Sequence, residues 1–364
     1  MKLIGWRTIP YSIPYHSGAS SLFRGVSRRD GLILMTLAKN GLTGLGEIAP
    51  LPGHSTETLA QAREQARVLS RELIDREIPG SPSELETVIA QIAGSGTFPS
   101  VVFGFETAIA DLASRATGLT LANWLTPTAH PAVPVNALLA GSPDAIEQEI
   151  GRIRLLGYRA YKIKVGRGRM EADVEVVARV RGLLGDTAVI RIDVNREWSF
   201  DQAIEALSRL RDYGISYVEE PLAGSQLHRI PELYESCGIP IALDETVSDM
   251  EKFESLIKEE AIRAIIIKPS VVGGLTRSLI LSRRMSDMGK ESVVSSLFES
   301  GVGLAACLHL AAALGGQAPP PCGLDTLRYL ENTLITGDLP VRDGCMAIPD
   351  GPGLGVNLSA AFQE

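Results

Sequence analysis

The sequence is poor in cysteine and carries no excess of positive charge, and both absences narrow its possible functions. The four cysteines are scattered and form no Cys-x-x-Cys pair. In a chain without a secretory signal, such cysteines are expected to be reduced thiols. The formal net charge of -8 argues against a nucleic-acid-binding protein, which needs a basic face.

Long hydrophobic runs are also missing. No window holds the roughly 18 to 20 apolar residues that a membrane-spanning helix requires. The N-terminal residues are interrupted by Pro10 and Pro14, and they show neither the apolar core nor the cleavage site of a signal peptide. We therefore expect a cytoplasmic protein with no membrane or nucleic-acid partner, and no protein partner is implied.

From about residue 133 onward, short β-rich runs alternate with amphipathic helical stretches. Continuous apolar strands that alternate with helices indicate βα units and a parallel sheet buried on both faces. Seven such runs, with an eighth near "PPCGLDT", fit a (β/α)8 barrel better than an open sheet. The seven runs are "VPVNALLA", "YKIKVG", "VIRIDVN", "YVEEP", "PIALDE", "AIIIKP" and "SVVSSL".

The first third of the chain has a different pattern. Two apolar segments separated by turn residues, "GLILMTLAKNG" and "TGLGEIAPL", are typical of a small antiparallel sheet, and three helical stretches follow them. We predict an α+β domain over residues 1–125 and a barrel over residues 126–339. Residues 340–364 are expected to return to the first domain.

The predicted barrel strands end in polar residues that lie about one βα unit apart in the sequence. Such residues should converge at the C-terminal end of the barrel, where barrel enzymes hold their catalytic groups. In chain order they are Lys164, Asp193, Glu219, Asp244, Lys268 and the pair Ser295 and Ser296.

Asp193, Glu219 and Asp244 are three carboxylates directed into one cavity. Three anions this close would repel one another strongly unless a cation compensates them. Oxygen ligands without His or Cys select a hard cation, so we expect Mg²⁺, with Mn²⁺ as a substitute. In the alternative interpretation, each carboxylate pairs separately with Arg191, Arg196 or a lysine at the rim.

Lys162 and Lys164 should both point into the barrel, because alternate residues of a strand share a face. Lys268, four units further round, should face them. Near Mg²⁺ and other ammonium groups, the pKa of a lysine falls toward working pH, which suits a general base. Such a base would take the proton next to a substrate carboxylate, and the resulting enediolate would then be reprotonated or expel a β-leaving group. In a simpler alternative, the lysines only balance the carboxylates.

Five motifs resemble the enolase superfamily, specifically its muconate-lactonising-enzyme subgroup. "KIKVG" looks like the paired-lysine motif, "RIDVNREW", "VEEPL" and "ALDET" look like the three metal-ligand strands, and "IIIKPS" looks like the opposite lysine. The resemblance covers essentially the whole chain. It implies a modified (β/α)8, TIM-like barrel with an N-terminal α+β capping domain.

Further stretches resemble the o-succinylbenzoate synthase branch of that subgroup, namely residues 44–59 and 98–112, "SSLFESGVGLAACLHLAA" and "CGLDT". This resemblance implies a Mg²⁺-dependent lyase of menaquinone biosynthesis. Its substrate would be a small dicarboxylate, 2-succinyl-6-hydroxy-2,4-cyclohexadiene-1-carboxylate, which is dehydrated to o-succinylbenzoate. "SSLFES" departs from the branch, in which a third serine is common, and this loosens the expected contacts to the succinyl arm.

The resemblance also implies the roles of the central residues. Asp193, Glu219 and Asp244 would bind the metal. Lys164 would take the proton and then assist departure of the hydroxyl group, which requires a syn elimination. Lys268 would stabilise the enediolate and the ring by its charge.

Other residues receive supporting roles from the same resemblance. Lys162 would lower the pKa of Lys164, and Asn195 would orient a metal ligand. Glu299 would contact residues of the site and not the substrate itself. Ser295, Ser296 and Gly323 would hold the second substrate carboxylate, although ordinary polar contacts are an alternative for the serines. Arg191 is expected to bind substrate because it points into the barrel in the same register as Asp193, and a structural role is its alternative.

Loops 16–31 and 51–55 are expected to close over the site, and His54 in the second loop could touch the substrate. By strand alternation, Glu220 and Glu245 are predicted to face outward.

Two isomerases on the same scaffold are rival interpretations. An N-succinylamino acid racemase or a dipeptide epimerase would use Lys164 and Lys268 as paired bases. A dipeptide epimerase usually has an Asp-x-Asp motif near the eighth strand, whereas "GLDTLRY" offers Asp325 alone. A non-catalytic metal-binding barrel would be expected to have lost a lysine or a ligand, but all six positions are filled.

Overall fold

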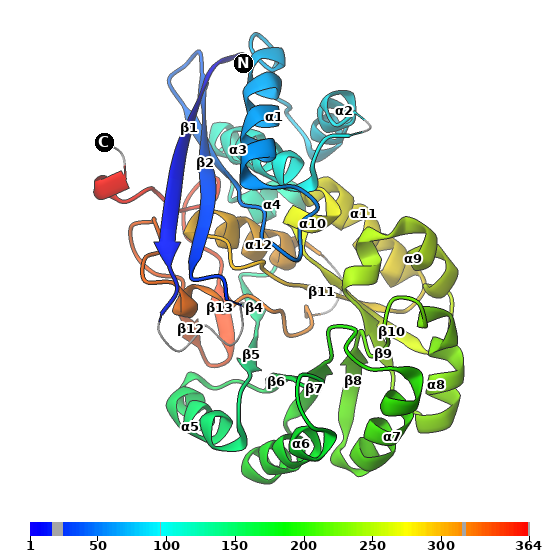
Figure 1. Cartoon of the computed structure of the whole chain (residues 1–364). Helices are drawn as coiled ribbons and strands as arrows, with labels where there is room; N and C mark the ends of the chain where they lie inside the picture. Colours follow the sequence, from blue (N-terminus) through cyan, green and yellow to red (C-terminus); the bar gives the residue numbers. More distant parts are fainter. Residues whose placement is uncertain (17–24, 95, 315–317, 363–364) are drawn as a thin grey trace.

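The computed structural model describes the whole chain except residues 17–24, 95, 315–317 and 363–364. An antiparallel sheet with its helices stands above a curled parallel sheet that is surrounded by helices (Figure 1). We call the upper part, built from strands β1–β3 and helices α1–α3, the cap. The lower part is the barrel. Of loop 16–31, which was predicted to close over the site, residues 17–24 lie outside the described residues and residues 28–31 belong to strand β2.

The cap consists of a three-stranded antiparallel sheet covered by helices, as the sequence predicts. Strand β2 lies between the other two and pairs with both. The strands are β1 (Leu3–Pro14), β2 (Arg28–Ala38) and β3 (Thr43–Ile48), and the helices are α1 (Leu59–Glu72), α2 (Pro82–Ile92) and α3 (Pro99–Thr117).

Helix α3 is buried along its length because glycines bring it unusually close to β3. A Cβ atom at Gly46 would lie 2.0 Å from the carbonyl oxygen of Gly104, and one at Gly44 would lie 2.2 Å from that of Ala108. Any larger side chain at these glycines would push the helix off the sheet. The close contact fixes α3 as the central helix of the cap.

The barrel is a parallel sheet of seven strands in the order β11-β10-β9-β8-β7-β6-β5. Each of the seven predicted runs overlaps one of these strands, which confirms the predicted fold class. The strands are β5 (Asn136–Leu139), β6 (Ala160–Lys164), β7 (Val189–Asp193), β8 (Ile215–Glu219), β9 (Ile241–Leu243), β10 (Ile262–Ile267) and β11 (Glu291–Val294).

Helices connect these strands on the outside of the barrel (Figure 1). Serine side chains cap the N-termini of α5 and α7, where Ser142 accepts from the Ala145 amide and Ser199 from the Gln202 amide. Left-handed glycines, such as Gly238 after α8 (φ 70°), end several of them. The helices are α5 (Pro143–Ile153), α6 (Met170–Leu184), α7 (Phe200–Leu210), α8 (Ile230–Cys237), α9 (Met250–Leu256), α10 (Pro269–Val272), α11 (Leu275–Asp287) and α12 (Gly301–Ala313).

Two residues, Cys322 and Gly323, take the place of the eighth strand. The Cys322 amide donates to the Pro134 carbonyl (2.8 Å) beside β5, and the Gly323 amide donates to the Val294 carbonyl (2.9 Å) of β11. They therefore bridge both edges of the seven-stranded sheet and close the barrel. The eighth run predicted at "PPCGLDT" is in the right place, but it is reduced to a bridge.

The C-terminal segment contacts both parts of the molecule. Strand β13 (Cys345–Ala347) pairs with β12 (Val341–Arg342) and with β4 (Ala132–Pro134), next to the first barrel strand. Further on, the Leu354 amide donates to Asp111 (2.7 Å) on α3 of the cap. The division of the chain at residues 125/126 and 339/340 stays a prediction.

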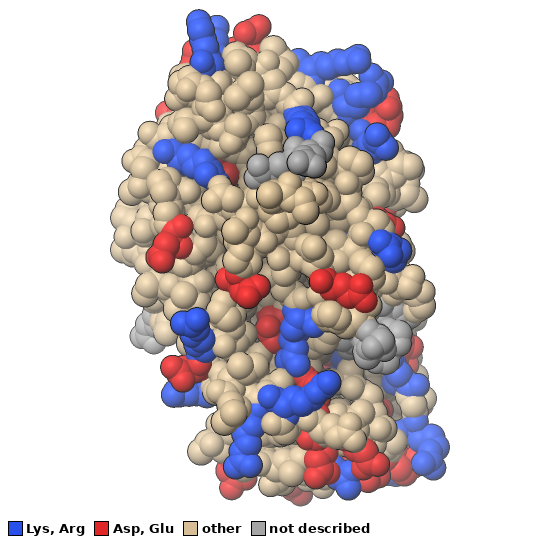
Figure 2. Space-filling model, turned by 90° about the vertical axis from the view of Figure 1, so that its left-hand side faces the viewer, with Lys and Arg blue, Asp and Glu red and all other residues tan. Residues whose placement is uncertain are grey.

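The surface carries charges of both signs. On the face shown in Figure 2, Lys and Arg side chains are interspersed with Asp and Glu. Exposed ion pairs such as Arg67–Glu64 and Arg229–Glu232 contribute little to stability. In the described part of the chain, no helix is long and apolar enough to cross a membrane.

Two buried glutamates of the cap bind the N-termini of barrel helices. Glu47 on β3 accepts hydrogen bonds from the amides of Ser300 (2.9 Å) and Gly303 (2.8 Å) at the start of α12. Glu106 on α3 accepts from the amides of Leu275 (2.6 Å) and Thr276 (2.9 Å) at the start of α11. Helix N-termini present unpaired N–H groups and a partial positive charge, so these carboxylates hold the cap on the barrel.

We expect Glu47→Ala to lower the free energy of unfolding by about 2 to 4 kcal/mol, because it leaves the buried amides of Ser300 and Gly303 unpaired. Urea denaturation followed by circular dichroism measures the change. Glu86→Ala, at an exposed position of α2, is the control and should leave the transition unchanged. Equal stability of Glu47→Ala and the wild type would show that the contact does not hold the cap.

Candidate active site

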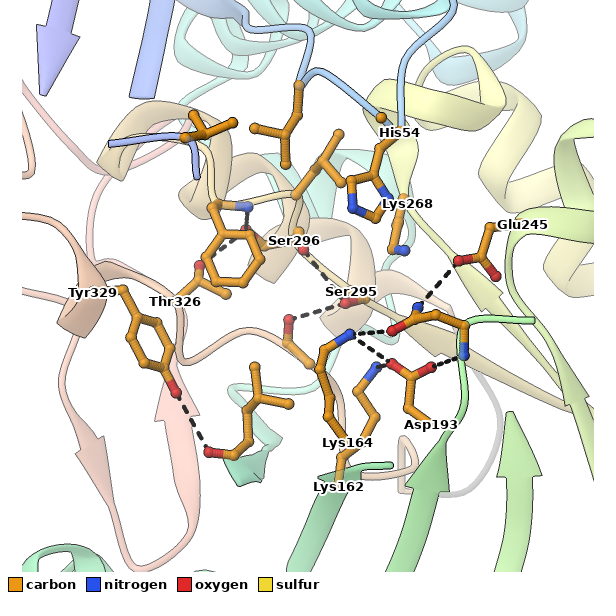
Figure 3. A pocket seen from close by; sticks show the side chains of 18 of the residues that line it. His54, Lys162, Lys164, Asp193, Glu245, Lys268, Ser295, Ser296, Thr326 and Tyr329 are labelled. Atoms are coloured by element: carbon orange, nitrogen blue, oxygen red, sulfur yellow. Dashed lines mark hydrogen bonds and ion pairs between the residues drawn. The ribbon is translucent and has the colours of Figure 1, made fainter. Parts of the chain in front are cut away.

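A cavity of about 280 Å³ lies between the C-terminal ends of the barrel strands and the cap. In Figure 3, Lys162, Lys164 and Asp193 rise from the barrel floor, while His54 and Lys268 point in from the other side. The cap contributes the loop of residues 51–54. The sequence predicts that loop 51–55 closes over the site, and in the structure residues 51–54 of this loop line the cavity.

Strand register brings the predicted polar residues together. In the register of neighbouring strands, Lys162 on β6 lies beside Arg191 on β7, and Lys164 lies beside Asp193. Asp193 lies in turn beside Glu219 on β8. Because alternate residues share a face, Lys164, Asp193 and Glu219 form one layer at the end of the barrel.

The carboxylates are held by lysines. The Lys162 ammonium lies 3.1 Å from Glu219 Oε1 and 3.2 Å from Asp193 Oδ2, so it stands between the two acids. The Lys164 ammonium donates to Asp193 Oδ2 (3.1 Å), and that of Lys268 donates to Asp244. Asp193 and Glu219 are almost completely buried, so charge neutralisation is required at this end of the barrel.

These contacts shift the pKa values of the acids. Burial opposes ionisation of Asp193, but the ammonium groups of Lys164 and Lys162 outweigh it and lower the pKa of Asp193. Burial likewise opposes ionisation of Asp244, and Lys268 lowers its pKa. Burial and the adjacent Asp193 carboxylate raise the pKa of Glu219 well above its usual range.

Two of the lysines have a raised pKa in this structure. Burial alone would lower the pKa of Lys162, but Glu219 and Asp193 raise it well above its usual value, and Asp244 does the same for Lys268. The lowered lysine pKa was predicted for a site that contains a divalent cation. Without that cation the carboxylates stabilise the ammonium forms of Lys162 and Lys268, and the lowered pKa stays a prediction for the cation-bound site.

The donor set fits a hard divalent cation. Asp193, Glu219 and Asp244 offer only carboxylate oxygens, and one ammonium nitrogen already lies within 3.2 Å of two of them. Among the described residues, no group of three Asp, Glu, His or Cys side chains is close enough together to hold a metal ion. Asp244 forms an ion pair with Lys268. Binding of a cation would therefore require Lys268 to release Asp244, and Lys162 to share Asp193 and Glu219 with the cation.

Glu245 points into the cavity, which corrects the outward direction predicted from strand alternation, whereas Glu220 is not among the described residues that line the cavity. Glu220 is fully buried and accepts from the amides of Asp244 (2.9 Å) and Thr246 (2.7 Å). Glu245 lines the cavity and accepts from Asn195 Nδ2 (3.1 Å). Alternation fails at Glu245 because strand β9 has already ended and Glu245 begins a 3₁₀ turn.

Asn195 connects the proposed base to this acidic group. Its side-chain oxygen accepts from the Lys164 ammonium (2.7 Å), while its amide nitrogen donates to Glu245. Its backbone amide donates to Asp193 Oδ1 (3.2 Å). The residue predicted to orient a ligand thus contacts both Asp193 and Lys164.

The two serines differ in their availability. The Ser296 hydroxyl donates to Glu299 (2.8 Å), contacts Thr326 (2.9 Å) and accepts from the Phe298 amide, so its capacity is filled. The Ser295 hydroxyl has only two long contacts of 3.4 Å to carbonyl oxygens. Gly323 faces it, and a Cβ there would lie 2.7 Å from Ser295 Oγ. Ser295 is therefore the serine that is free to bind a ligand.

Arg191 lies below the cavity and is not among its described lining residues. Its Nη1 donates to the Pro321 carbonyl (2.6 Å), and its guanidinium stacks 4.9 Å from the ring of Tyr217. One strand layer separates it from Asp193, so it supports the cavity floor. Direct substrate contact by Arg191 was predicted from its register, and the structure corrects that prediction.

Other lining residues were not singled out from the sequence. Phe298 and Tyr329 form one wall, with ring centroids 5.8 Å apart in an edge-to-face arrangement. Asp325 also reaches the cavity, where Tyr158 and Arg328 bond to its Oδ2. These residues lie in loops and short turns, where the sequence has no periodic pattern that predicts which way a side chain points.

Comparison with known proteins agrees with this arrangement. Residues 145–362 match the family described as Enolase C-terminal domain-like, and residues 6–112 match the family described as MenC, N-terminal domain. The chain belongs to the enolase superfamily. It is therefore an enzyme with a capped barrel of that superfamily.

Individual relatives of this enolase superfamily member have different reactions in their names. An o-succinylbenzoate synthase of Edwardsiella ictaluri is 33% identical over 89% of this chain and 91% of its own length. An N-succinylamino acid racemase of Thermus thermophilus is 31% identical over 93% of this chain and 90% of its own length. A dipeptide epimerase of Enterococcus faecalis, complexed with Mg and L-Leu-L-Tyr, has the same fold at a TM-score of 0.87 and 24% identity, covering 98% of this chain and 100% of that one.

We expect Lys162→Met to destabilise the protein in the presence of a chelator by about 3 kcal/mol at pH 7, because two buried carboxylates lose their shared cation. The folded pKa of Asp193 then rises, and that of Glu219, which is already raised, rises further, so the deficit should shrink as pH falls toward 5. Urea denaturation at several pH values measures it, with the exposed Lys258→Met as control. A deficit that is independent of pH would mean that lost packing, and not charge, is responsible.

Proposed function

We propose that the chain is an o-succinylbenzoate synthase, which dehydrates 2-succinyl-6-hydroxy-2,4-cyclohexadiene-1-carboxylate to o-succinylbenzoate in menaquinone biosynthesis. The observation that carries this choice is the cap, since residues 6–112 match the MenC N-terminal domain and form the cavity wall at residues 51–54. The relative from Edwardsiella ictaluri supports the same reaction.

Lys164 is proposed as the base. It lies on β6 at the cavity floor, and Asn195 and Asp193 fix its ammonium nitrogen. In its neutral form it would take the proton from the ring carbon that bears the carboxylate. It would then return that proton to the hydroxyl group leaving the adjacent carbon, so that water departs from the same face and the ring becomes aromatic.

Lys268 is proposed to stabilise charge from the opposite side. Strand β10 is the fourth strand after β6, and the bridge at Cys322 and Gly323 closes the barrel in the place of an eighth strand. β6 and β10 therefore lie on opposite sides of the barrel, and Figure 3 shows Lys164 and Lys268 reaching the cavity from different sides. A permanently charged ammonium there would favour the negative charge that develops on the substrate carboxylate.

Asp193, Glu219 and Asp244 are proposed to hold Mg²⁺, for which Mn²⁺ would substitute. When bound, the cation would stabilise negative charge on the substrate carboxylate. Lys162 would remain beside Asp193 and Glu219 and limit the repulsion between them. Ser295 and the Gly323 backbone are proposed to receive the carboxylate of the succinyl arm.

N-succinylamino acid racemase is the second candidate, because Lys164 and Lys268 on opposite faces would also serve as paired bases and the relative from Thermus thermophilus bears that name. A dipeptide epimerase is less well supported. Asp325, the acid near the eighth strand, already accepts from Tyr158 and Arg328, so its charge is offset before any substrate ammonium arrives.

We expect the purified enzyme to aromatise the cyclohexadiene substrate with Mg²⁺, and Lys164→Ala to slow this reaction by at least about 10³-fold, in the range of general base catalysis. The exposed Lys258→Ala should retain full activity. Ultraviolet absorption follows the reaction. Exchange of the α-proton of N-succinyl amino acids in D₂O, without any aromatisation, would instead establish the racemase.

A further inference from the structure

Arg29 is a fully buried arginine of the cap, and within the described part of the chain its guanidinium donates hydrogen bonds to backbone carbonyl groups. It has a relative exposure of 1%. Its Nε donates to the Phe298 carbonyl (3.0 Å), and its Nη1 donates to those of Asp30 (3.1 Å) and Pro50 (3.1 Å). Its Nη2 donates to the Ala49 carbonyl. One side chain therefore connects three separate stretches of chain.

Two of these stretches lie at the lining of the cavity, one on the side of the cap and one on the side of the barrel. Ala49 and Pro50 lead directly into cap residues 51–54, which line it. Phe298 lines it from the barrel side, where its ring packs against Tyr329. Phe298 also has a left-handed φ of 59°, a conformation that a bulky residue adopts only when its surroundings impose it.

The contact is well placed to act on the non-reacting end of a ligand. Lys164 and Asp193 stand on the barrel floor, whereas the cap loop that carries His54 lies on the other side of the cavity (Figure 3), and Phe298 also lines this cavity. A change in the spacing between this loop and Phe298 would alter the room for a substrate arm and leave the lysines in place.

We propose that Arg29 is a positioning residue that fixes the spacing between cap loop 49–55 and barrel residues 297–298, and thereby sets the length of the substrate arm that the enzyme accepts. The proposal rests on the proposed function only in the identity of the arm. An arginine is required because its planar fork presents several N–H donors in fixed directions, whereas the single ammonium of lysine cannot reach all three stretches.

The test compares Arg29→Met and Arg29→Lys with Arg28→Met, an exposed neighbour whose side chain bonds to Ser12. Steady-state kinetics are measured on the cyclohexadiene substrate with its succinyl arm and on an analogue with a glutaryl arm, one methylene longer. One methylene in a fitted pocket is worth roughly 10- to 200-fold in kcat/KM. The wild type and Arg28→Met should prefer the succinyl arm by at least about tenfold.

In Arg29→Met this preference should fall below about threefold, through a rise of about tenfold in KM for the succinyl substrate and little change in kcat. Arg29→Lys should lie between it and the wild type. An unchanged preference in a folded Arg29→Met, or a loss confined to kcat, would overturn the proposal. If Arg29→Met does not fold, Arg29→Lys decides, and a preference equal to that of the wild type refutes the proposal.

Failure of the proposed function would be recognised separately. If the wild-type enzyme does not aromatise the cyclohexadiene but exchanges the α-proton of N-succinyl amino acids, the same comparison is made with N-succinyl and N-glutaryl amino acids. The predicted change of preference in the Arg29 variants is the same in either reaction, because it depends on the arm and not on the reacting carbon.

Discussion

The mutual neutralisation of buried lysines and carboxylates at the C-terminal end of the barrel is the constraint on which the site depends. Lys162 stands between Asp193 and Glu219, and Lys268 pairs with Asp244. Neither set of charges would be stable there alone, because an isolated buried ion pays a large desolvation penalty. Neighbouring barrel strands place the lysines and the carboxylates side by side, so the strand register itself brings the opposite charges together.

The cap completes what the barrel begins. Glu47 and Glu106 bind the N-termini of α12 and α11, and Arg29 bonds to the barrel at Phe298. These contacts place the loop at residues 51–54 over the strand ends. The barrel thus provides the lysines and carboxylates of the candidate site, while the cap and the segment after β11 line the rest of the cavity.

Much of the fold and the centre of the site could be predicted from the sequence, because parallel strands obey a strict alternation. That rule placed Lys162, Lys164, Asp193 and Glu219 on one inner face. It failed at Glu245, which follows the last residue of β9 and turns inward. The same rule correctly predicted that Arg191 points into the barrel, but it could not predict that Arg191 lies below the cavity and does not line it. The cap contacts could not be predicted, since Arg29 and Phe298 are 269 residues apart and no local pattern links them.

The most direct test of this account is a calorimetric titration of the metal-free protein with Mg²⁺, compared with Glu219→Gln and Asp244→Asn. If the three carboxylates form one cation site that lysines occupy in its absence, the wild type should bind a single Mg²⁺ and each variant should bind it at least about tenfold more weakly. Binding of equal strength in the wild type and both variants would contradict the account, because the carboxylates would then be structural partners of the lysines and not metal ligands.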